Sequence, residues 1–193
     1  DDVVVTPGWL EGLRECMEEA PRVCPGGRRA GLVGPVTNRG GGPQEVQNPP
    51  PASVPLDEHA ERHREAFRRR WETAFTLASF CLMMRRDALD RIGTFDERFY
   101  PLGHGDDDLS LRMQEAGFDC YVASDVYVHH EGGATVDRAF GPSAAGRRNL
   151  DLFYDKWRER RRGKTKLVAT YRVKNAAATL AELKIEIQTL ARL

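Results

Sequence analysis

Hydrophobic and polar residues alternate along the chain in short blocks, and these blocks predict strands and helices that follow one another. The apolar residues 3–5 are followed by a Thr-Pro-Gly turn at 6–8 and by a helical pattern that begins at Trp9. A strand end, a turn and a helix start explain this order, because proline is tolerated where a helix begins. The residues expected on one apolar face of the helix are Trp9, Leu10, Leu13 and Met17.

Three further apolar stretches predict strands of a core. Residues 31–37 indicate a short buried strand, residues 75–84 form the most apolar stretch and predict a core strand, and residues 121–130 predict another. Three consecutive glycines within 38–43 predict a loop. The proline-rich residues 48–56 cannot form a regular ladder and are expected to be an extended connector.

Helical patterns occupy most of the remaining chain. They predict helices over 57–71, 87–92, 106–116, 149–157 and 176–193. Gly93 ends the helix at 87–92, and Gly117 stands where a left-handed cap belongs. We therefore expect a mixed α/β domain over 1–157, with a loop insertion at 48–72, followed by a basic linker and a C-terminal helix over 158–193.

Composition and charge exclude several classes of protein. The chain has 193 residues, of which 40% are hydrophobic, and its 29 basic and 29 acidic residues cancel. A net charge of zero argues against a nucleic-acid-binding protein, although the arginine-rich tail keeps that alternative open. No apolar run reaches the roughly 20 residues of a membrane-spanning helix. Four cysteines without CxxC spacing argue against a zinc site or disulfide framework and favour a reducing compartment.

Three adjacent carboxylates, at Asp106, Asp107 and Asp108, form the most informative cluster. They repel one another unless a proton, a cation or a helix N-terminus stabilises them. One of them can simply cap the predicted helix. Gly103 and Gly105 precede the cluster and allow the backbone to approach a ligand closely. In such a position an aspartate can act as a general base that accepts a proton from an attacking hydroxyl.

The pair His129 and His130 lies at the end of a predicted strand. Successive side chains of a strand point to opposite faces, so at most one histidine faces a given site. A neutral imidazole is a good ligand for a divalent ion, and Asp1 and Asp2 are candidate partners. Two carboxylates and a histidine would suit Mn²⁺ or Mg²⁺ bound jointly with a diphosphate. An exposed or core histidine without a metal is the alternative.

Five segments occur in an order that resembles family 2 glycosyltransferases. The segments are 2–10, 31–38 with Pro43-Gln44, 79–86 running into 92–99, the carboxylate cluster with Leu109 and Arg112, and His129-His130 with Gly132 and Thr135. The match extends from Asp1 to about Trp157. Each motif is moderately specific by itself, and their shared order strengthens the resemblance.

The resemblance implies a Rossmann-like, mixed-sheet α/β fold of the GT-A type. It also implies inverting transfer of a sugar from a nucleotide diphosphate sugar to a hydroxyl of a glycan, lipid-linked or protein acceptor. The cofactor would be Mn²⁺ or Mg²⁺, and no nucleic acid would be bound. A bacterial enzyme of cell envelope polysaccharide synthesis would be cytoplasmic, with the basic residues 156–166 contacting anionic lipid at the inner face of the membrane. An exposed linker is the alternative for 156–166.

Site residues follow from the resemblance position by position. Asp106 corresponds to the general base, and Asp2 and His130 correspond to the metal ligands. Gly105-Asp106 stands where the family has Glu-Asp, so Asp107 remains possible as the base, and His129 remains possible as the ligand. The residues expected to bind substrate are Gly105, Asp108, Arg112 and His129.

The family's opening strand–helix repeats, which hold the donor base and ribose, have no counterpart in this sequence. We therefore expect the chain to correspond to the C-terminal acceptor and catalytic half, lacking the N-terminal nucleotide-binding half. A non-catalytic sugar-binding or scaffolding remnant of such a domain is the alternative function. Turnover of a nucleotide sugar with Mn²⁺ would separate the two.

Overall fold

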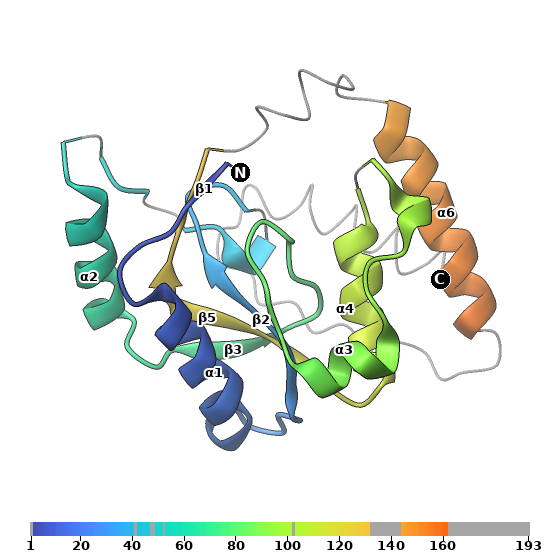
Figure 1. The fold of residues 1–193 in the computed structure, drawn as a ribbon, viewed down its shortest axis with the longest axis horizontal. Coiled ribbons are helices and arrows are strands. Elements are labelled where there is room, and N and C mark those ends of the chain that lie inside the picture. Colours follow the sequence, from blue (N-terminus) through green and yellow to red (C-terminus); the bar gives the residue numbers. More distant parts are fainter. Residues whose placement is uncertain are drawn as a thin grey trace, which may run out of the picture.

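The computed structural model describes residues 2–40, 42–46, 49–51, 53–101, 103–131 and 144–161, which form a mixed α/β fold (Figure 1). The helices are α1 (Trp9–Val23), α2 (Leu56–Ala66), α3 (Arg86–Ile92), α4 (Gly105–Glu115) and α6 (Ala144–Arg161), with 3₁₀ turns η1 (Gly42–Gln44) and η2 (Glu97–Phe99). The strands are β1 (Val3–Val4), β2 (Ala30–Val36), β3 (Trp71–Ala74), β4 (Met83–Met84), β5 (Asp119–Tyr127) and β6 (His129–His130).

A mixed sheet with the strand order β3-β5-β2-β4 forms the centre of the fold. The two central strands, β2 and β5, are parallel, whereas β3 and β4 pair antiparallel to them at the edges. Every residue of β2 is buried. This agrees with the continuous apolar pattern at 31–37, because a central strand covered on both faces needs no polar positions.

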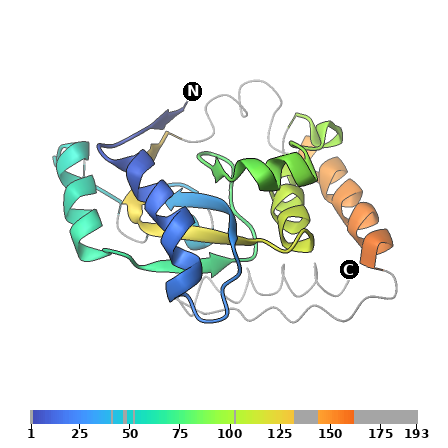
Figure 2. The same ribbon diagram turned by 60° about the horizontal axis from the view of Figure 1, so that its bottom comes forward.

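Helices cover both faces of the sheet, and β5 supplies alternate residues to the two sides (Figures 1 and 2). On one face, α1 packs Leu13 and Cys16 against Tyr121 of β5. On the other face, Ala88 of α3 and Leu109 of α4 pack against Val122. The alternation follows from the period of two along a strand, and it places α4, which carries the carboxylate cluster, on the face opposite α1.

A third apolar cluster attaches α6 to the outer side of α4 and to η2. Its buried members are Phe99, Leu111, Phe153, Tyr154 and Trp157. The predicted helix at 149–157 is therefore confirmed, but it begins earlier, at Ala144. The predicted helix at 176–193 and most of the basic linker lie outside the described residues.

Residues 75–84 do not form the predicted core strand. Only Met83–Met84 pair with the sheet, and the side chain of Phe75 is 41% exposed. Backbone amides that a strand would pair with its neighbour donate to side chains instead. The Leu77 amide donates to Ser110 Oγ (3.1 Å), and the Ala78 amide donates to Gln44 Oε1 (2.7 Å). This apolar stretch is thus a loop held by side-chain hydrogen bonds.

Three other predicted elements have different limits or orientations. The helix at 57–71 ends at Ala66, because Trp71 pairs with β5 and its indole N–H donates to Asp125 Oδ1 (2.8 Å). The strand at 121–130 divides into β5 and β6. Leu10 was expected on the buried face of α1 but is 49% exposed.

The predicted helix ends at two glycines are confirmed. Gly93 follows α3 with φ 75°, and Gly117 follows α4 with φ 90°, a backbone conformation that favours glycine. None of the described helices is long and apolar enough to cross a membrane.

We expect Gly31→Ala to destabilise the protein. A Cβ at Gly31 would lie 2.7 Å from Phe118 Cβ and would also meet the Met113 side chain, so β2 and α4 would have to separate. Overpacking of this kind costs about 1–3 kcal/mol of unfolding free energy, measurable by urea denaturation. Gly105→Ala is the matched control, because its Cβ would meet Phe99 and Phe95 at ordinary distances of 3.5 and 3.7 Å. Equal stability of the two variants would contradict this packing.

Candidate functional site

A cavity of about 840 Å³ lies beside the N-terminus of α4. The residues that line it are Ser79, Phe95, Asp96, Glu97, Phe99, Tyr100, Pro101, Gly103, Gly105 and Asp106. One wall thus comes from the segment 95–101, and the other comes from α4 and the loop that contains Ser79. Of the residues expected to form the site, Gly105 and Asp106 line this cavity.

The carboxylate of Asp106 is half-buried at the cavity wall. Its Oδ2 accepts a hydrogen bond from the Ser79 amide (3.3 Å), and its Oδ1 accepts one from the Asp107 amide (3.1 Å). Burial, and secondarily the neighbouring charge of Asp107, raises the pKa of Asp106 above the ordinary value for aspartate. A carboxylate that is oriented, partly desolvated and more basic than usual suits the task of accepting a proton.

Asp107 has a different environment, although it is the next residue of the same helical turn. Its Oδ2 lies 2.8 Å from Nδ1 of His104, the residue that precedes α4 with φ 63°. The His104 ring in turn packs near Phe153 of α6, with the ring centroids 5.6 Å apart. Asp107 is half-exposed but does not line the cavity, so of these two carboxylates Asp106 is the one at the cavity wall.

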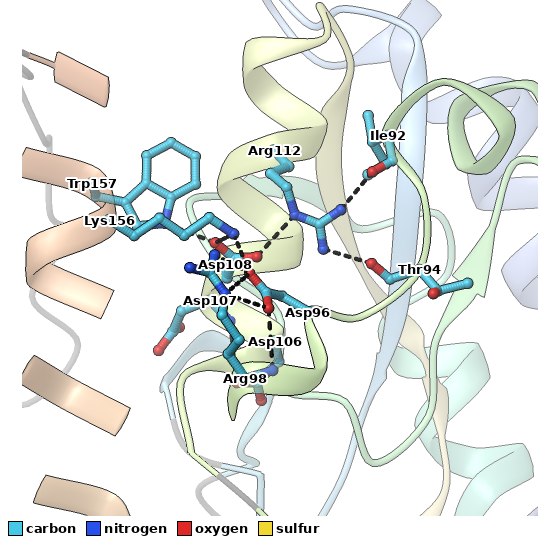
Figure 3. A network of polar contacts seen from close by, with 10 residues as sticks. All are labelled: Ile92, Thr94, Asp96, Arg98, Asp106, Asp107, Asp108, Arg112, Lys156 and Trp157. Carbon is cyan, nitrogen blue, oxygen red and sulfur yellow. Dashed lines mark hydrogen bonds and ion pairs between the residues drawn. The ribbon is translucent and has the colours of Figure 1, made fainter. Parts of the chain in front are cut away.

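Asp108 is enclosed within the protein (Figure 3). Its side chain has no exposed surface, and it accepts hydrogen bonds from Arg112 Nε (2.8 Å) and the indole of Trp157 (3.0 Å). The ammonium group of Lys156 lies 2.7 Å from Asp108 Oδ1. The structure therefore places Asp108, expected to bind substrate, among contacts within the fold and away from the cavity.

Arg112, which was also expected to bind substrate, is used inside the fold as well. Besides its contact with Asp108, it donates to the backbone carbonyls of Ile92 (2.7 Å) and Thr94 (2.8 Å), as Figure 3 shows. Arg112 thus connects α4 to the end of α3, and its side chain is not among those that line the cavity.

Lys156 is not part of a lipid-facing basic surface. Its side chain is 11% exposed and lies between two carboxylates, 2.8 Å from Asp96 Oδ2 and 2.7 Å from Asp108 Oδ1. This corrects the expectation for the start of the 156–166 stretch, because a cation buried in ion pairs cannot contact an anionic headgroup. Residues 162–166 lie outside the described part of the chain.

Asp96 is a site residue that the sequence did not indicate. It lines the cavity, and its carboxylate caps η2 by accepting from the Arg98 amide. Hydrogen bonds from the Arg98 guanidinium, and then from Lys156, hold the pKa of Asp96 well below its usual range. Asp96 belongs to the Phe-Asp-Glu-Arg-Phe segment at 95–99, which resembles a family motif. Its ion pair with Lys156, 60 residues further along the chain, leaves no spacing signal in the sequence.

Asp2 and His130 lie together at the other candidate position. Antiparallel pairing of β1 with β6 sets Val3 opposite His130, and this brings His130 Nε2 to 3.3 Å from Asp2 Oδ2. His130 Nδ1 lies 2.6 Å from the Arg39 carbonyl, which can only accept, so Nδ1 donates to it and the Nε2 side of the ring faces Asp2. Asn38 holds the His130 backbone through hydrogen bonds to both its amide and its carbonyl.

His129 points to different partners, as the alternation along a strand requires. Its Nδ1 lies 3.3 Å from the Tyr127 hydroxyl, and its Nε2 lies 3.7 Å from Glu131 Oε1. Of the two histidines, His130 is therefore the one that lies beside Asp2. The structure does not place His129 among the residues of the cavity.

The donor set at Asp2 and His130 fits part of a metal site. A carboxylate oxygen and a neutral imidazole nitrogen, the latter oriented through its other ring nitrogen, are common ligands of divalent ions. Within the described residues no group of three histidine, cysteine or acidic side chains could hold a metal. The two side chains would thus hold a divalent ion only together with further donors, such as the oxygens of a bound diphosphate.

Two consecutive residues connect the two candidate positions. The Ser79 amide donates to Asp106, and the ring of Phe80 stacks on the His130 imidazole with the centroids 5.4 Å apart. Because neighbouring Cα atoms are about 3.8 Å apart, the loop places Asp106 and the Asp2–His130 pair in the same region of the molecule. The loop that replaces the predicted strand at 75–84 therefore joins both halves of the site.

We expect the three aspartates to differ in their effect on stability. Asp108→Asn should lower the unfolding free energy by about 3–5 kcal/mol. The change removes the buried negative charge that compensates the positive charges of Lys156 and Arg112. Asp107→Asn, at a half-exposed pair, should cost less than about 1 kcal/mol. Urea denaturation of the variants measures both values, and a surface-like value for Asp108→Asn would contradict its burial.

The pH dependence of stability provides a test of Asp106. Since its pKa is raised in the folded state, ionised Asp106 lowers stability above that pKa, and this penalty disappears as the pH falls through it. Asp106→Asn should therefore be as stable as the parent or more stable at pH 7.5. The difference should shrink toward acid pH. If Asp106→Asn is less stable than the parent at pH 7.5 and this difference disappears at acid pH, the pKa of Asp106 is lowered by folding and the prediction is wrong.

Comparison with known proteins gives a distant relationship. No protein-family model matches the chain. The chain is 28% identical over 149 residues to N-acetylglucosaminyl-diphospho-decaprenol L-rhamnosyltransferase from Mycobacterium tuberculosis strains CDC 1551 and H37Rv. The match covers 69% of this chain and 46% of the relatives, so the chain spans about half the length of the curated relatives it matches. This similarity relates the chain distantly to a glycosyltransferase.

Proposed function

We propose that this chain carries the acceptor side and the general base of an inverting, GT-A-type family 2 glycosyltransferase. The observation that supports it best is Asp106, a carboxylate of raised pKa at the wall of a cavity. The distant similarity to a rhamnosyltransferase agrees with this assignment. The complete enzyme would use a nucleotide diphosphate sugar, and the name of the relatives favours a lipid-linked acceptor in cell envelope synthesis.

The cavity has the chemistry that a sugar acceptor requires. Phe95 and Tyr100 offer exposed rings for the apolar C–H side of a sugar, and the carboxylates of Glu97 and Asp106 can accept hydrogen bonds from its hydroxyls. Tyr100 is 72% exposed, so its ring is accessible to a bound molecule. An acceptor hydroxyl within hydrogen-bond distance of Asp106 would be correctly placed to react.

The base acts while the new bond forms. The acceptor oxygen attacks the anomeric carbon of the donor, the bond from that carbon to the diphosphate oxygen breaks, and the diphosphate leaves with the electron pair. The proton of the acceptor hydroxyl passes to Asp106. The Ser79 and Asp107 amides hold the carboxylate in a fixed orientation, so little reorganisation is needed during the transfer.

Asp2 and His130 would hold Mn²⁺ or Mg²⁺ together with the donor diphosphate. Such an ion supplies positive charge that stabilises the departing diphosphate. The chain's own contribution is orientation: the Arg39 carbonyl accepts from His130 Nδ1 and orients the ring, and Asn38 holds the His130 backbone. The link through Ser79 and Phe80 would keep this position in register with the base.

Asp106→Asn in the complete protein tests the base. We expect it to fold and to bind donor but to lose 10²–10⁴-fold in sugar transfer, the typical contribution of general base catalysis. The measurement is kcat per folded protein, with Asp107→Asn as the matched control. If Asp106→Asn transfers sugar at nearly the parental rate and Asp107→Asn is inactive, Asp107 is the base. A parent protein that turns over no nucleotide sugar with Mn²⁺ would favour a scaffold instead.

Removal of the candidate ligands tests the metal position. Asp2→Ala should weaken Mn²⁺ affinity in the presence of a nucleoside diphosphate such as UDP or dTDP, because the ion loses its carboxylate ligand. His130→Ala should act in the same direction but more mildly. Titration calorimetry measures both, with His129→Ala as the control that should retain affinity. If only His129→Ala reduces affinity, the ligand is the neighbouring histidine.

A further inference from the structure

Helix α6 holds both walls of the cavity from outside. In Figures 1 and 2 it lies beside α4. Asn149 donates to the Phe99 carbonyl (2.5 Å) and Arg148 to the Tyr100 carbonyl (3.4 Å), so two contacts reach the 95–101 wall. The Trp157 indole donates to Asp108 (3.0 Å) on α4, the wall that also carries Asp106.

Lys156 connects these two walls through a single atom. Its Nζ lies 2.8 Å from Asp96, which lines the cavity, and 2.7 Å from Asp108, two residues after Asp106 (Figure 3). Among the contacts of the described residues, it is the one side chain that bonds both carboxylates. The distance between the two carboxylates is thus limited by the reach of one ammonium group.

Neutralisation of charge does not explain the position of Lys156 fully. Asp96 also binds the Arg98 guanidinium (2.6 Å), and Asp108 also binds Arg112 and Trp157. Each carboxylate would therefore keep a cation if Lys156 were replaced. What would be lost is the direct ionic bridge between Asp96, in the segment 95–101, and Asp108, in the first turn of α4.

We propose that Lys156 is a positioning residue, whose ammonium group fixes the 95–101 wall of the cavity relative to Asp106. Its kinetic consequence depends on the proposed function, since the segment would hold the acceptor while Asp106 takes the proton. A displacement of about 1 Å between reacting groups can cost on the order of 10²-fold in rate. Lys156 does not line the cavity and would act through Asp96 and Asp108.

Lys156→Met tests the proposal, with Arg158→Met as the matched control. Arg158 lies on the same helix, and it pairs with Asp155 (3.5 Å). In the complete protein, Lys156→Met should lower kcat for transfer by on the order of 10²-fold per folded molecule, with the donor KM unchanged. Lys156→Arg, which retains the charge and can bond both carboxylates, should restore most of the rate. A purely structural role would instead lower the folded fraction and leave kcat per folded molecule intact.

A second readout does not depend on activity. The amides of Ser79 and Asp107 donate to the Asp106 carboxylate, so their NMR shifts report its position. In the 193-residue chain, Lys156→Met should move both signals, whereas Lys156→Arg and Arg158→Met should leave them near the parental positions. Unmoved signals in folded Lys156→Met would overturn the proposal. Moved signals in a protein that transfers no sugar would support the positioning role and contradict the proposed function.

If Lys156→Met does not fold, Trp157→Phe tests whether the contacts of α6 with α4 position Asp106. This change keeps an aromatic ring in the apolar cluster but removes the N–H that donates to Asp108. Since the contact holds α4 from the same helix, the Ser79 and Asp107 amides should move in the same direction but by less. Parental amide shifts and a parental kcat in Trp157→Phe would then overturn the proposal.

Discussion

The buried carboxylate of Asp108 is the constraint on which the rest of this region depends. A carboxylate with no exposed surface must find charged or hydrogen-bonding partners, because its desolvation is otherwise too costly. One partner, Arg112, lies on the same helix, whereas Lys156 and Trp157 come from α6, nearly 50 residues along the chain. The need to satisfy one interior charge thus attaches α6 to α4.

The three adjacent aspartates have three different environments, and the helix is the reason. Successive residues of an α-helix are rotated by about 100°, so neighbours cannot share one direction. Asp108 points inward, Asp107 turns to His104, and Asp106 is left at the cavity wall with two amide donors. Their mutual repulsion is reduced because their partners differ. Of the three aspartates, Asp106 is the one that lines the cavity, and burial raises its pKa.

The loop at 75–82 supports the candidate site because it is not a strand. Its backbone amides are taken by the side chains of Ser110, Gln44 and Asp106 instead of a neighbouring strand. Had it joined the sheet, the Ser79 amide would have pointed into the ladder and Asp106 would have lost a donor. The same loop sets Phe80 against His130, so Asp106 and the candidate metal ligands share one support.

The sequence by itself determined the elements whose pattern is local. Periodicity and glycine caps indicated α3 and α4, a continuous apolar run indicated β2, and strand alternation separated His129 from His130. The candidate base and the candidate ligand pair were also visible, because their signals lie within short motifs. Only the tertiary structure decided that residues 75–82 form a loop, that Lys156 is buried between Asp96 and Asp108, and that Asp108 lies inside. Those outcomes depend on partners distant in sequence, and a buried charge or backbone amide takes whichever partner the fold brings near it.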